Sequence, residues 1–338
     1  MRSLCVRVLK GEGESVRKKL LELGVLDSAL KIIREDDFIL FPVFDSVPDI
    51  GYTVFEEEFD ERRIMETDYK SLVCLPEALR PLLPTSFDVI GDIGIFRLPD
   101  ELSSYAKEIG SALLGAFPRL RTVAMDKGVK GEFRVRDLEV VAGDERLETM
   151  HQEYGIRLLV DPSRVYFNPR LAGERHRVAS QVREGETVID MFSGIGPFAI
   201  MIAKQAKPFA VFALDINPDC IEYMRSNIEI NKVSTVVPIE GDARHAMFDI
   251  PCADRIVMNL PHTARQFFAE ALTRSNIGGT IHFYHICERH EIDSVLEQMQ
   301  LEARGMGVCV DVAHKEELKT YSPSASVFSA DLFLRDWC

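Results

Sequence analysis

Hydrophobic and polar positions follow three different patterns along this chain of 338 residues. Residues 1–45 contain an apolar run, a segment with apolar positions at helical spacing and a second apolar run, which predicts a strand, a helix and a strand. The acidic, turn-rich stretch from residue 45 to about residue 69 has the composition of a surface linker. We therefore expect a small α+β module at the N-terminus.

The second pattern begins near residue 79. Helical spacing predicts a helix at about residues 101–115, and an apolar run predicts a strand near residues 120–125. Two segments of short alternating strands follow, VKGEFRVRDLEVVAG and YGIRLLVDPSRVYFN, and together they predict an antiparallel sheet. The middle of the chain is therefore expected to form a second α+β module.

The third pattern begins near residue 168 and alternates buried strands with helical stretches. This alternation is typical of a doubly wound parallel sheet. The last segment, GVCVDVAHKEELKTYSPSASVFSADLFLRD, predicts a β-hairpin that closes the sheet, as in class I methyltransferases. The expected parallel strands are residues 187–190, 210–215, 235–239, 254–259 and 279–285.

Length and composition set the outline of the molecule. The chain exceeds the usual size of one domain, and we expect domains at residues 1–65, 70–165 and 166–338. The predicted fold class is α/β, with a Rossmann-like domain preceded by two smaller α+β domains. No apolar run reaches about 18 residues and the chain turns charged at once, so we expect a cytoplasmic protein without a membrane partner. The seven cysteines include no C-x-x-C pair, so no metal site is expected.

The net charge of −14 would by itself discourage a nucleic-acid partner. The local distribution of charge differs from this total. Residues 118–136 carry six basic side chains against two acidic ones, and residues 164–183 carry five arginines against Glu174 alone. Such runs can be solvated faces. Because both precede or adjoin the strand at residues 187–190, we expect them to contact nucleic acid.

The most informative motif is VIDMFSGIGPF, in which a strand ends at Asp190 directly before a glycine turn. Glycine has no Cβ, so the backbone at Gly194 and Gly196 can come close to a ligand. The next strand ends at Asp215, where a carboxylate suits a ribose diol. A turn of this kind fits NAD, FAD and S-adenosylmethionine alike.

Three details favour S-adenosylmethionine. Asp190 precedes the glycines, where it can hold the ligand's ammonium, and the turn lacks the final glycine of the dinucleotide fingerprint. A third strand-end acid follows at Asp242. The alternative, a turn whose glycines only permit packing, does not explain acids at successive strand ends. The expected cofactor-binding residues are Asp190, Phe192, Gly194, Gly196, Asp215, Ile216, Asp242, Ala243 and Asn259.

The fourth strand ends in Asn259-Leu260-Pro261-His262, at the sheet edge where open α/β folds bind ligands. Amino-methyltransferases carry N-P-P-Y/F at this point. Leu260 and His262 depart from that pattern, which argues against an exocyclic amine as the methyl acceptor. For His262 the sequence leaves two alternatives open, a substrate contact and a solvent-facing loop histidine.

Methylation of a ring nitrogen such as guanine N1 requires a base, because N1 must lose its proton. Glu174, flanked by Arg175 and Arg177, is the candidate, and the alternative is a glutamate in surface ion pairs. Deprotonation of N1 moves negative charge onto O6. A cation near O6 should stabilise that charge, and Arg134 is available.

Five segments resemble the archaeal and eukaryotic Trm5 family of tRNA guanine-37 N1-methyltransferases. They occur in the family's order and extend the resemblance through essentially the whole chain. The segments are TSFDVIGDI (85–93), GEFRVR (131–136), VYFNPRLAGER (165–175), DMFSGIGPF (190–198) and MNLP (258–261).

The resemblance implies a monomeric enzyme that methylates N1 of guanosine 37 and contacts both the anticodon loop and the elbow of tRNA, the elbow through its N-terminal module. Two alternatives stay open: a wybutosine-pathway transferase, which transfers the aminocarboxypropyl arm or methylates a tricyclic intermediate, and an RNA-binding protein with a vestigial cofactor fold. The implied roles are O6 stabilisation by Arg134, lining of the guanine pocket by Tyr166, general base catalysis by Glu174, and positioning of the base edge by Asn259 and Pro261.

Overall fold

The chain forms two compact units, Met1–Asp68 and Tyr69–Cys338, which we describe separately. No described helix is long and apolar enough to cross a membrane. The computed structural model describes residues 2–27, 29–35, 37–44, 51–60, 68–131, 133, 135–322 and 324–337.

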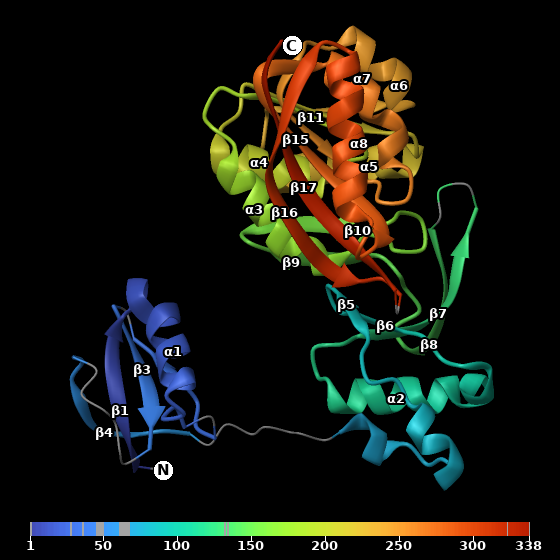
Figure 1. The fold of residues 1–338 in the computed structure, drawn as a ribbon. Coiled ribbons are helices and arrows are strands. Elements are labelled where there is room, and N and C mark those ends of the chain that lie inside the picture. The colour runs from blue at the N-terminus through green and yellow to red at the C-terminus, as the bar shows by residue number, and fades with distance from the viewer. Residues whose placement is uncertain are drawn as a thin grey trace. The chain divides into compact units, whose positions relative to one another are not determined.

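The described residues of the first unit form a four-stranded antiparallel sheet that packs against helix α1 (Figure 1). Val16 and Leu20 of the helix pack into a core with Val6, Val8 and Phe41 of the strands. The expected strand–helix–strand order is therefore present. The strand order is β2-β3-β1-β4, with β1 at Arg2–Leu9, α1 at Gly13–Glu22, β2 at Ile33–Arg34, β3 at Phe38–Val43 and β4 at Val54–Glu58.

Strand β4 lies in the acidic stretch that the composition predicts to be a linker, so this prediction is wrong for residues 54–58. The strand pairs with β1, and Phe55 packs against a small core that contains Cys5 and Leu40. Its glutamates are exposed at the edge of the sheet. Backbone pairing and one apolar side chain therefore outweigh the acidic composition. Residues 45–50 and 61–67 of the stretch lie outside the described part of the chain.

The second unit begins with the sheet β5-β6-β7-β8, covered by the helix α2. We expected an antiparallel sheet, but β6 and β7 are parallel. The reason is the connection between them, because α2 forms a crossover, and crossovers return the chain in the same direction. The elements are β5 (Asp88–Ile90), β6 (Ile93–Phe96), α2 (Ala106–Ala116), β7 (Thr122–Lys130) and β8 (Val135–Gly143).

Strands β9 (Thr149–Glu153) and β10 (Ile156–Val160) form a sheet of their own, which corrects the expectation that they continue the preceding one. Two asparagines of α5 (Pro218–Asn231) hold β10 instead. The Asn227 side chain accepts a hydrogen bond from the Leu159 amide at 2.6 Å and donates one to its carbonyl at 3.1 Å. Asn231 repeats this pattern at Arg157. These side chains satisfy the backbone groups that a neighbouring strand would otherwise pair.

A seven-stranded sheet, in the order β13-β12-β11-β14-β15-β17-β16, follows. Strands β11 to β15 are parallel, and β17 and β16 close the sheet as the expected antiparallel hairpin. The predicted fold class is confirmed. The strands are β11 (Thr187–Asp190), β12 (Ala210–Asp215), β13 (Val236–Glu240), β14 (Ala253–Met258), β15 (Ser275–Glu288), β16 (Val308–Thr320) and β17 (Ala325–Trp337).

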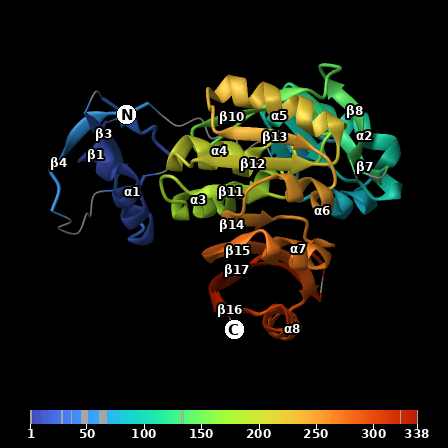
Figure 2. The same cartoon turned by 90° about the horizontal axis from the view of Figure 1, so that it is seen from above.

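Helices cover both faces of this sheet (Figure 2). Val188 and Ile189, neighbours in β11, belong to different cores because successive strand residues point to opposite faces. One core contains residues of α3, α4 and α5, and the other contains residues of α6, α7 and α8. Besides α5, these helices are α3 (Ala172–Gln181), α4 (Pro197–Ala206), α6 (Ala243–Ala246), α7 (Phe268–Thr273) and α8 (Ile292–Gly305).

Candidate functional site

The strand order reverses between β11 and β14, and ligands of open α/β sheets bind at the carboxyl ends of such strands. Asp190 is the last residue of β11, and Asn259 directly follows β14. The Met191 amide donates a hydrogen bond to the Val257 carbonyl at 3.0 Å, which ties the two strand ends together. The fold therefore brings these two expected site residues to one edge.

The glycine turn after β11 has the geometry that the sequence predicts. Gly196 has a φ of +83°, and a Cβ there would lie 2.8 Å from the Met224 side chain. Gly194 has a φ of +55°, and a Cβ there would lie 3.5 Å from the Tyr166 carbonyl oxygen. Any other residue would strain the turn at both positions. The backbone of Tyr166 therefore lies beside the turn, although α3 and β11 separate the two in sequence.

Asp190 is completely buried, and its two carboxyl oxygens make no well-formed hydrogen bond among the described residues. Burial, with the nearby Asp215 charge as a second cause, raises the pKa of Asp190 to about 8. A buried polar group without a partner is costly, so such a group needs a functional explanation. An ammonium group placed against this carboxylate would supply the missing partner. The arrangement thus fits the amino group of S-adenosylmethionine.

Asp215 fixes the glycine turn as well as facing the same edge. Its Oδ2 accepts a hydrogen bond from the Gly194 amide at 2.7 Å, and its Oδ1 accepts one from the Asn217 amide at 2.9 Å. Burial is the main cause that raises the pKa of Asp215. A carboxylate at this strand end suits the hydroxyls of a ribose, which can donate hydrogen bonds to it.

The other expected cofactor residues include apolar side chains, Ile216 and Phe192, and a polar one, Asp242. Ile216 is 51% exposed directly after β12, although it is a large aliphatic residue, and it could lie against a flat adenine ring. The Phe192 ring packs edge-on against Phe267 with ring centroids 4.9 Å apart. Asp242 caps α6 by accepting the Arg244 amide at 2.9 Å, and Ala243 is buried behind it. The donor set fits S-adenosylmethionine, and the individual roles stay predictions.

Glu174 is not the surface glutamate of the alternative interpretation, because only 7% of it is exposed. Its Oε1 accepts hydrogen bonds from the Tyr284 hydroxyl at 2.8 Å and from Arg177 Nη2 at 2.7 Å. Its Oε2 accepts one hydrogen bond, from Arg177 Nε at 2.8 Å. Both lone pairs of Oε1 are therefore in use, whereas Oε2 keeps one that can accept a proton.

Arg177 has a second carboxylate partner on β17. Its Nη1 and Nη2 donate to Asp331 at 2.6 and 3.0 Å, and the Asp331 carboxylate also contacts His282 Nδ1 at 2.6 Å. Burial would raise the pKa of Asp331, but the hydrogen bonds from His282 and Arg177 outweigh it and hold this pKa well below its usual range. The Arg177 guanidinium thus keeps a charged partner when Glu174 gains a proton.

Glu174 faces a cavity of about 460 Å³ between the start of α3 and strand β16. This volume lies in the range of small-molecule sites. The catalytic candidate therefore borders a space that can receive a nucleotide base. The lining residues are Arg170, Leu171, Gly173, Glu174, Arg177, Glu316, Leu318 and Lys319.

Of the remaining predicted catalytic residues, the structure describes all except Arg134. Arg134 lies outside the described residues. Tyr166 is 54% exposed beside the glycine turn, and Asn259 is half-buried at the end of β14. The Pro261 carbonyl accepts a hydrogen bond from the Ile286 amide at 3.1 Å, so it is held at the end of the sheet. His262 is exposed and lies edge-on to the Tyr321 ring, at 5.5 Å between ring centroids.

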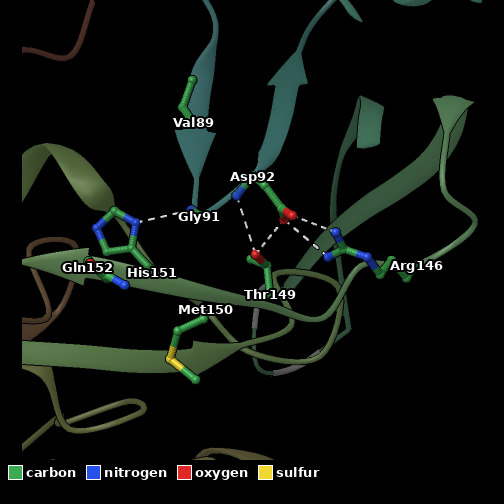
Figure 3. A pocket seen from close by; sticks show the side chains of 8 residues that line it. All are labelled: Val89, Gly91, Asp92, Arg146, Thr149, Met150, His151 and Gln152. Carbon is green, nitrogen blue, oxygen red and sulfur yellow. Dashed lines mark hydrogen bonds and ion pairs between the residues drawn. The ribbon is translucent and has the colours of Figure 1, made fainter. Parts of the chain in front are cut away.

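A second cavity, of about 400 Å³, contains none of the predicted site residues (Figure 3). Its polar groups bind one another. Asp92 accepts hydrogen bonds from Arg146 at 2.6 and 3.1 Å and from the Thr149 hydroxyl at 2.7 Å. The Gly91 amide donates to His151 Nδ1 at 3.2 Å. We interpret this cluster as a structural connection between the β5–β6 turn and strand β9.

The connection continues to α3 through residues that the sequence analysis did not identify. His151 Nε2 lies 3.4 Å from Glu153 Oε2, and the buried Glu153 carboxylate binds both Nε and Nη2 of the buried Arg175, at 2.6 and 2.5 Å. Arg175 Nη1 donates to the Asn168 carbonyl at 3.1 Å. This pair holds the segment between Tyr166 and Glu174. Its only signal in the sequence is an arginine beside the candidate base.

Family models match most of the chain. Residues 149–311 match the TRM5/TYW2 methyltransferase domain, residues 72–146 the TYW2 N-terminal domain, and residues 5–51 the tRNA methyltransferase 5 N-terminal domain. The matches extend from the first unit to the seven-stranded sheet. The three matches follow one another along the chain without overlap.

Individual relatives match over nearly the full length. A Trm5b tRNA (guanine(37)-N(1))-methyltransferase from Pyrococcus abyssi is 45% identical over 95% of this chain and 96% of its own. The Trm5b of Methanocaldococcus jannaschii is 34% identical over 97% of this chain and 98% of its own. A solved complex of aTrm5 with tRNALeu is 32% identical in sequence, with a TM-score of 0.68, over 98% of this chain and 100% of that protein.

Proposed function

Because this chain belongs to the Trm5 family, we propose that it transfers a methyl group from S-adenosylmethionine to N1 of guanosine 37 in tRNA. The observation that carries the proposal is the likeness, over nearly the whole chain, to proteins named for that reaction. The buried Asp190 and Glu174 supply the chemistry that the reaction needs at one end of the sheet. The resemblance found in the sequence is confirmed at the level of the family.

The cofactor occupies the carboxyl edge of the sheet in this proposal. When bound, S-adenosylmethionine supplies an electrophilic methyl group. Asp190 holds its ammonium, Asp215 holds the ribose hydroxyls, and Ile216 lies against the adenine. Phe192, Asp242, Ala243 and the backbone at Gly194 and Gly196 complete the site.

Glu174 is the general base of the proposed reaction. Oε2 accepts the proton from guanine N1, because Oε1 is saturated by Tyr284 and Arg177. Removal of this proton creates negative charge on N1 and O6. Arg177 remains neutralised by Asp331 throughout, so no unpaired cation is left buried. Arg134 stabilises the charge on O6, Tyr166 lines the guanine pocket, and Asn259 and Pro261 hold the base edge.

The alternative activity of the superfamily would transfer the aminocarboxypropyl arm of the same cofactor. The match of residues 72–146 to the TYW2 N-terminal domain is the observation that supports this alternative. Whole-length likeness to N1-methyltransferases favours methyl transfer. An assay with two labelled cofactors separates the two reactions.

In that assay, a tRNA transcript with guanosine at position 37 is incubated with the enzyme and cofactor labelled either in the methyl group or in the carboxyl group. We expect label in the RNA only from the methyl-labelled cofactor. Transfer of carboxyl label would establish aminocarboxypropyl transfer and contradict the proposal. Absence of both labels, in the presence of bound cofactor and bound tRNA, would favour a vestigial RNA-binding protein.

A further inference from the structure

The cavity beside Glu174 has an imbalance of charge that the base does not explain. Arg170, Arg177 and Lys319 are its cationic lining residues, and Glu174 and Glu316 are its acidic ones. Arg177 is fully engaged by Glu174 and Asp331, as described above. Arg170 and Lys319 are therefore the lining cations that an anionic ligand can use, and Glu316 is the acidic lining residue beside them.

Strand β16 aims Lys319 into this cavity by an irregularity in its pairing. Glu317 pairs with Phe328 of β17, but Lys319 pairs with Val327, so Leu318 is an extra residue. A β-bulge of this kind redirects side chains, and bulges are common beside active sites. The neighbours Leu318 and Lys319 consequently both line the cavity, whereas in a regular strand they would point to opposite faces.

The Lys319 ammonium lies within ion-pairing distance of no carboxylate in the described part of the chain. The side chain is half-buried. Burial is the main cause that lowers the pKa of Lys319, and the nearby Arg170 and Arg136 add to the effect against the opposing charge of Asp88. Placing a cation in such surroundings costs free energy unless an anion joins it.

Arg170 is held so that part of its guanidinium stays available. Its Nε and Nη2 bind Asp88 Oδ1 at 2.9 and 2.8 Å, and Arg136 occupies the other oxygen of the same carboxylate at 2.9 Å. The Arg170 side chain is nevertheless 58% exposed. Asp88 thus orients both arginines, and Arg136 has a second acidic partner in Asp126, whereas neither acid is ion-paired with Lys319.

We propose that Arg170 and Lys319 form an anion subsite that binds a phosphate group of the RNA next to the target nucleotide. Arg170 presents a fork of N–H donors and Lys319 a compact charge, two complementary ways to bind phosphate oxygens. Two residues beyond Lys319, Tyr321 contacts His262 of the loop that follows β14. The subsite therefore shares its cavity with Glu174, and strand β16 leads from Lys319 towards the loop that also contains Asn259 and Pro261. This inference rests on the proposed function.

The cofactor is the other source of an anion, since it carries a carboxylate. We favour RNA because the cavity is lined by residues of α3, of the segment before it and of β16, whereas the predicted cofactor residues follow β11, β12, β13 and β14, and none of them lines this cavity. The test must separate these two sources. It uses the full-length protein, an anticodon stem-loop RNA and S-adenosylhomocysteine as probes.

The decisive variant is Lys319→Met, which keeps an unbranched apolar stem and removes the charge. We expect stem-loop RNA to bind about tenfold more weakly near 0.1 M salt, and the slope of log affinity against log salt to fall by about 0.7–0.9 for one lost phosphate contact. Lys319→Arg should restore both quantities. The matched control is Lys315→Met, because Lys315 lies on the same strand but is ion-paired with Asp293 at 2.5 Å. It should leave both quantities unchanged.

Affinity for S-adenosylhomocysteine should not change in Lys319→Met. A tenfold loss of this affinity with unchanged RNA binding would assign the anion to the cofactor and overturn the proposal. An unchanged salt slope in both Lys319→Met and the milder Lys319→Gln, with both variants melting like the wild type, would also overturn it. RNA binding is read without catalysis, so a wild-type enzyme that fails to methylate guanosine 37 would refute the proposed function separately.

Discussion

The proposed methyl transfer depends on one buried glutamate, Glu174, whose Oε2 has one lone pair left to accept a proton. A carboxylate can act as a base in a buried site only if its surroundings tolerate both of its protonation states. Glu174 meets this condition because Arg177 is shared with Asp331, 154 residues further along the chain. The sequence identified Glu174 as a candidate, but neither Asp331 nor Tyr284 could be found from spacing. Contacts over such separations follow from the fold.

The substitution Glu174→Gln should therefore slow chemistry without unfolding the protein. Glutamine keeps the shape of the side chain and cannot accept the N1 proton, and Arg177 retains Asp331. We expect a loss of about 10²–10⁴-fold in the single-turnover rate of methylation at saturating enzyme, with RNA affinity nearly unchanged. Rising pH should partly restore the rate, since N1 then ionises without help.

As a control, Tyr284→Phe removes one hydrogen bond to Glu174 and leaves the base in place. A wild-type rate for Glu174→Gln between pH 6 and 9 would exclude the role of Glu174.

Asp190 predicts a pH dependence of cofactor binding. Below its pKa of about 8 the carboxyl group of the free protein is mostly protonated, whereas a bound ammonium favours the carboxylate. Binding should release a proton, so the affinity for S-adenosylhomocysteine should rise between pH 6 and 7.5, by at most about tenfold per pH unit. Calorimetry in buffers of different ionisation enthalpy measures the released proton. Asp190→Asn should bind weakly and independently of pH. A pH-independent affinity of the wild type would rule out this role.

At the scale of elements, the helix that carries the base is fixed by a buried ion pair. Removing one partner of such a pair leaves a buried charge alone, which commonly costs about 3–5 kcal/mol. We expect this loss of unfolding free energy for Arg175→Leu, because Glu153 then remains buried without its cation. Arg164→Leu is the control, since Arg164 pairs with Asp219 at the surface and should cost about 1 kcal/mol at most. Equal and small losses in urea unfolding would show that the pair is not structural.

The elements also show what the pattern of the sequence can and cannot predict. The strands at residues 187–190 and 210–215 are as predicted, because an apolar run that ends at an acid and a turn specifies a buried parallel strand. β4 and the separate β9–β10 sheet were missed. In both cases the deciding interaction is distant in sequence: pairing with β1, and side-chain amides of α5. The composition of a short segment does not predict which distant segment will pair with it.

The same distinction holds within the candidate site. Strand ends and glycines predict the edge of the sheet at which the cofactor is proposed to bind, since both follow from local backbone rules. The direction of the Lys319 side chain depends on a bulge in β16, and the neighbouring residues in the sequence do not predict this bulge. The Glu153–Arg175 pair joins a strand to a helix across 22 residues and likewise gave no local signal. The backbone geometry of the glycine turn was thus predictable, whereas the supporting side chains were not.

At the scale of the whole molecule, an acidic protein must bind an acidic polymer. The net charge of −14 repels RNA at long range, so binding depends on local cationic surfaces. The structure reduces the number of candidates in residues 118–136, because Lys127, Lys130 and Arg136 are ion-paired with acids of the same module. Lys319 and the exposed part of Arg170 are then stronger candidates for contacts with RNA.

The first unit is compact and has its own hydrophobic core. Removal of residues 1–68 should weaken binding of full-length tRNA more than binding of an isolated anticodon stem-loop, because the unit is expected to contact the elbow. Titrations of both RNAs with the full-length and shortened proteins measure the difference. Equal losses on the two RNAs would contradict a role at the elbow.

The central claim is that the molecule methylates one atom of one nucleotide. Nucleoside analysis after reaction with unmodified tRNA tests it most directly, with a transcript that carries guanosine 37 and a matched transcript that carries adenosine there. We predict 1-methylguanosine, at one per tRNA, in the first transcript and no methylated nucleoside in the second. Methyl transfer to another atom of guanosine, or equal methylation of both transcripts, would contradict the account.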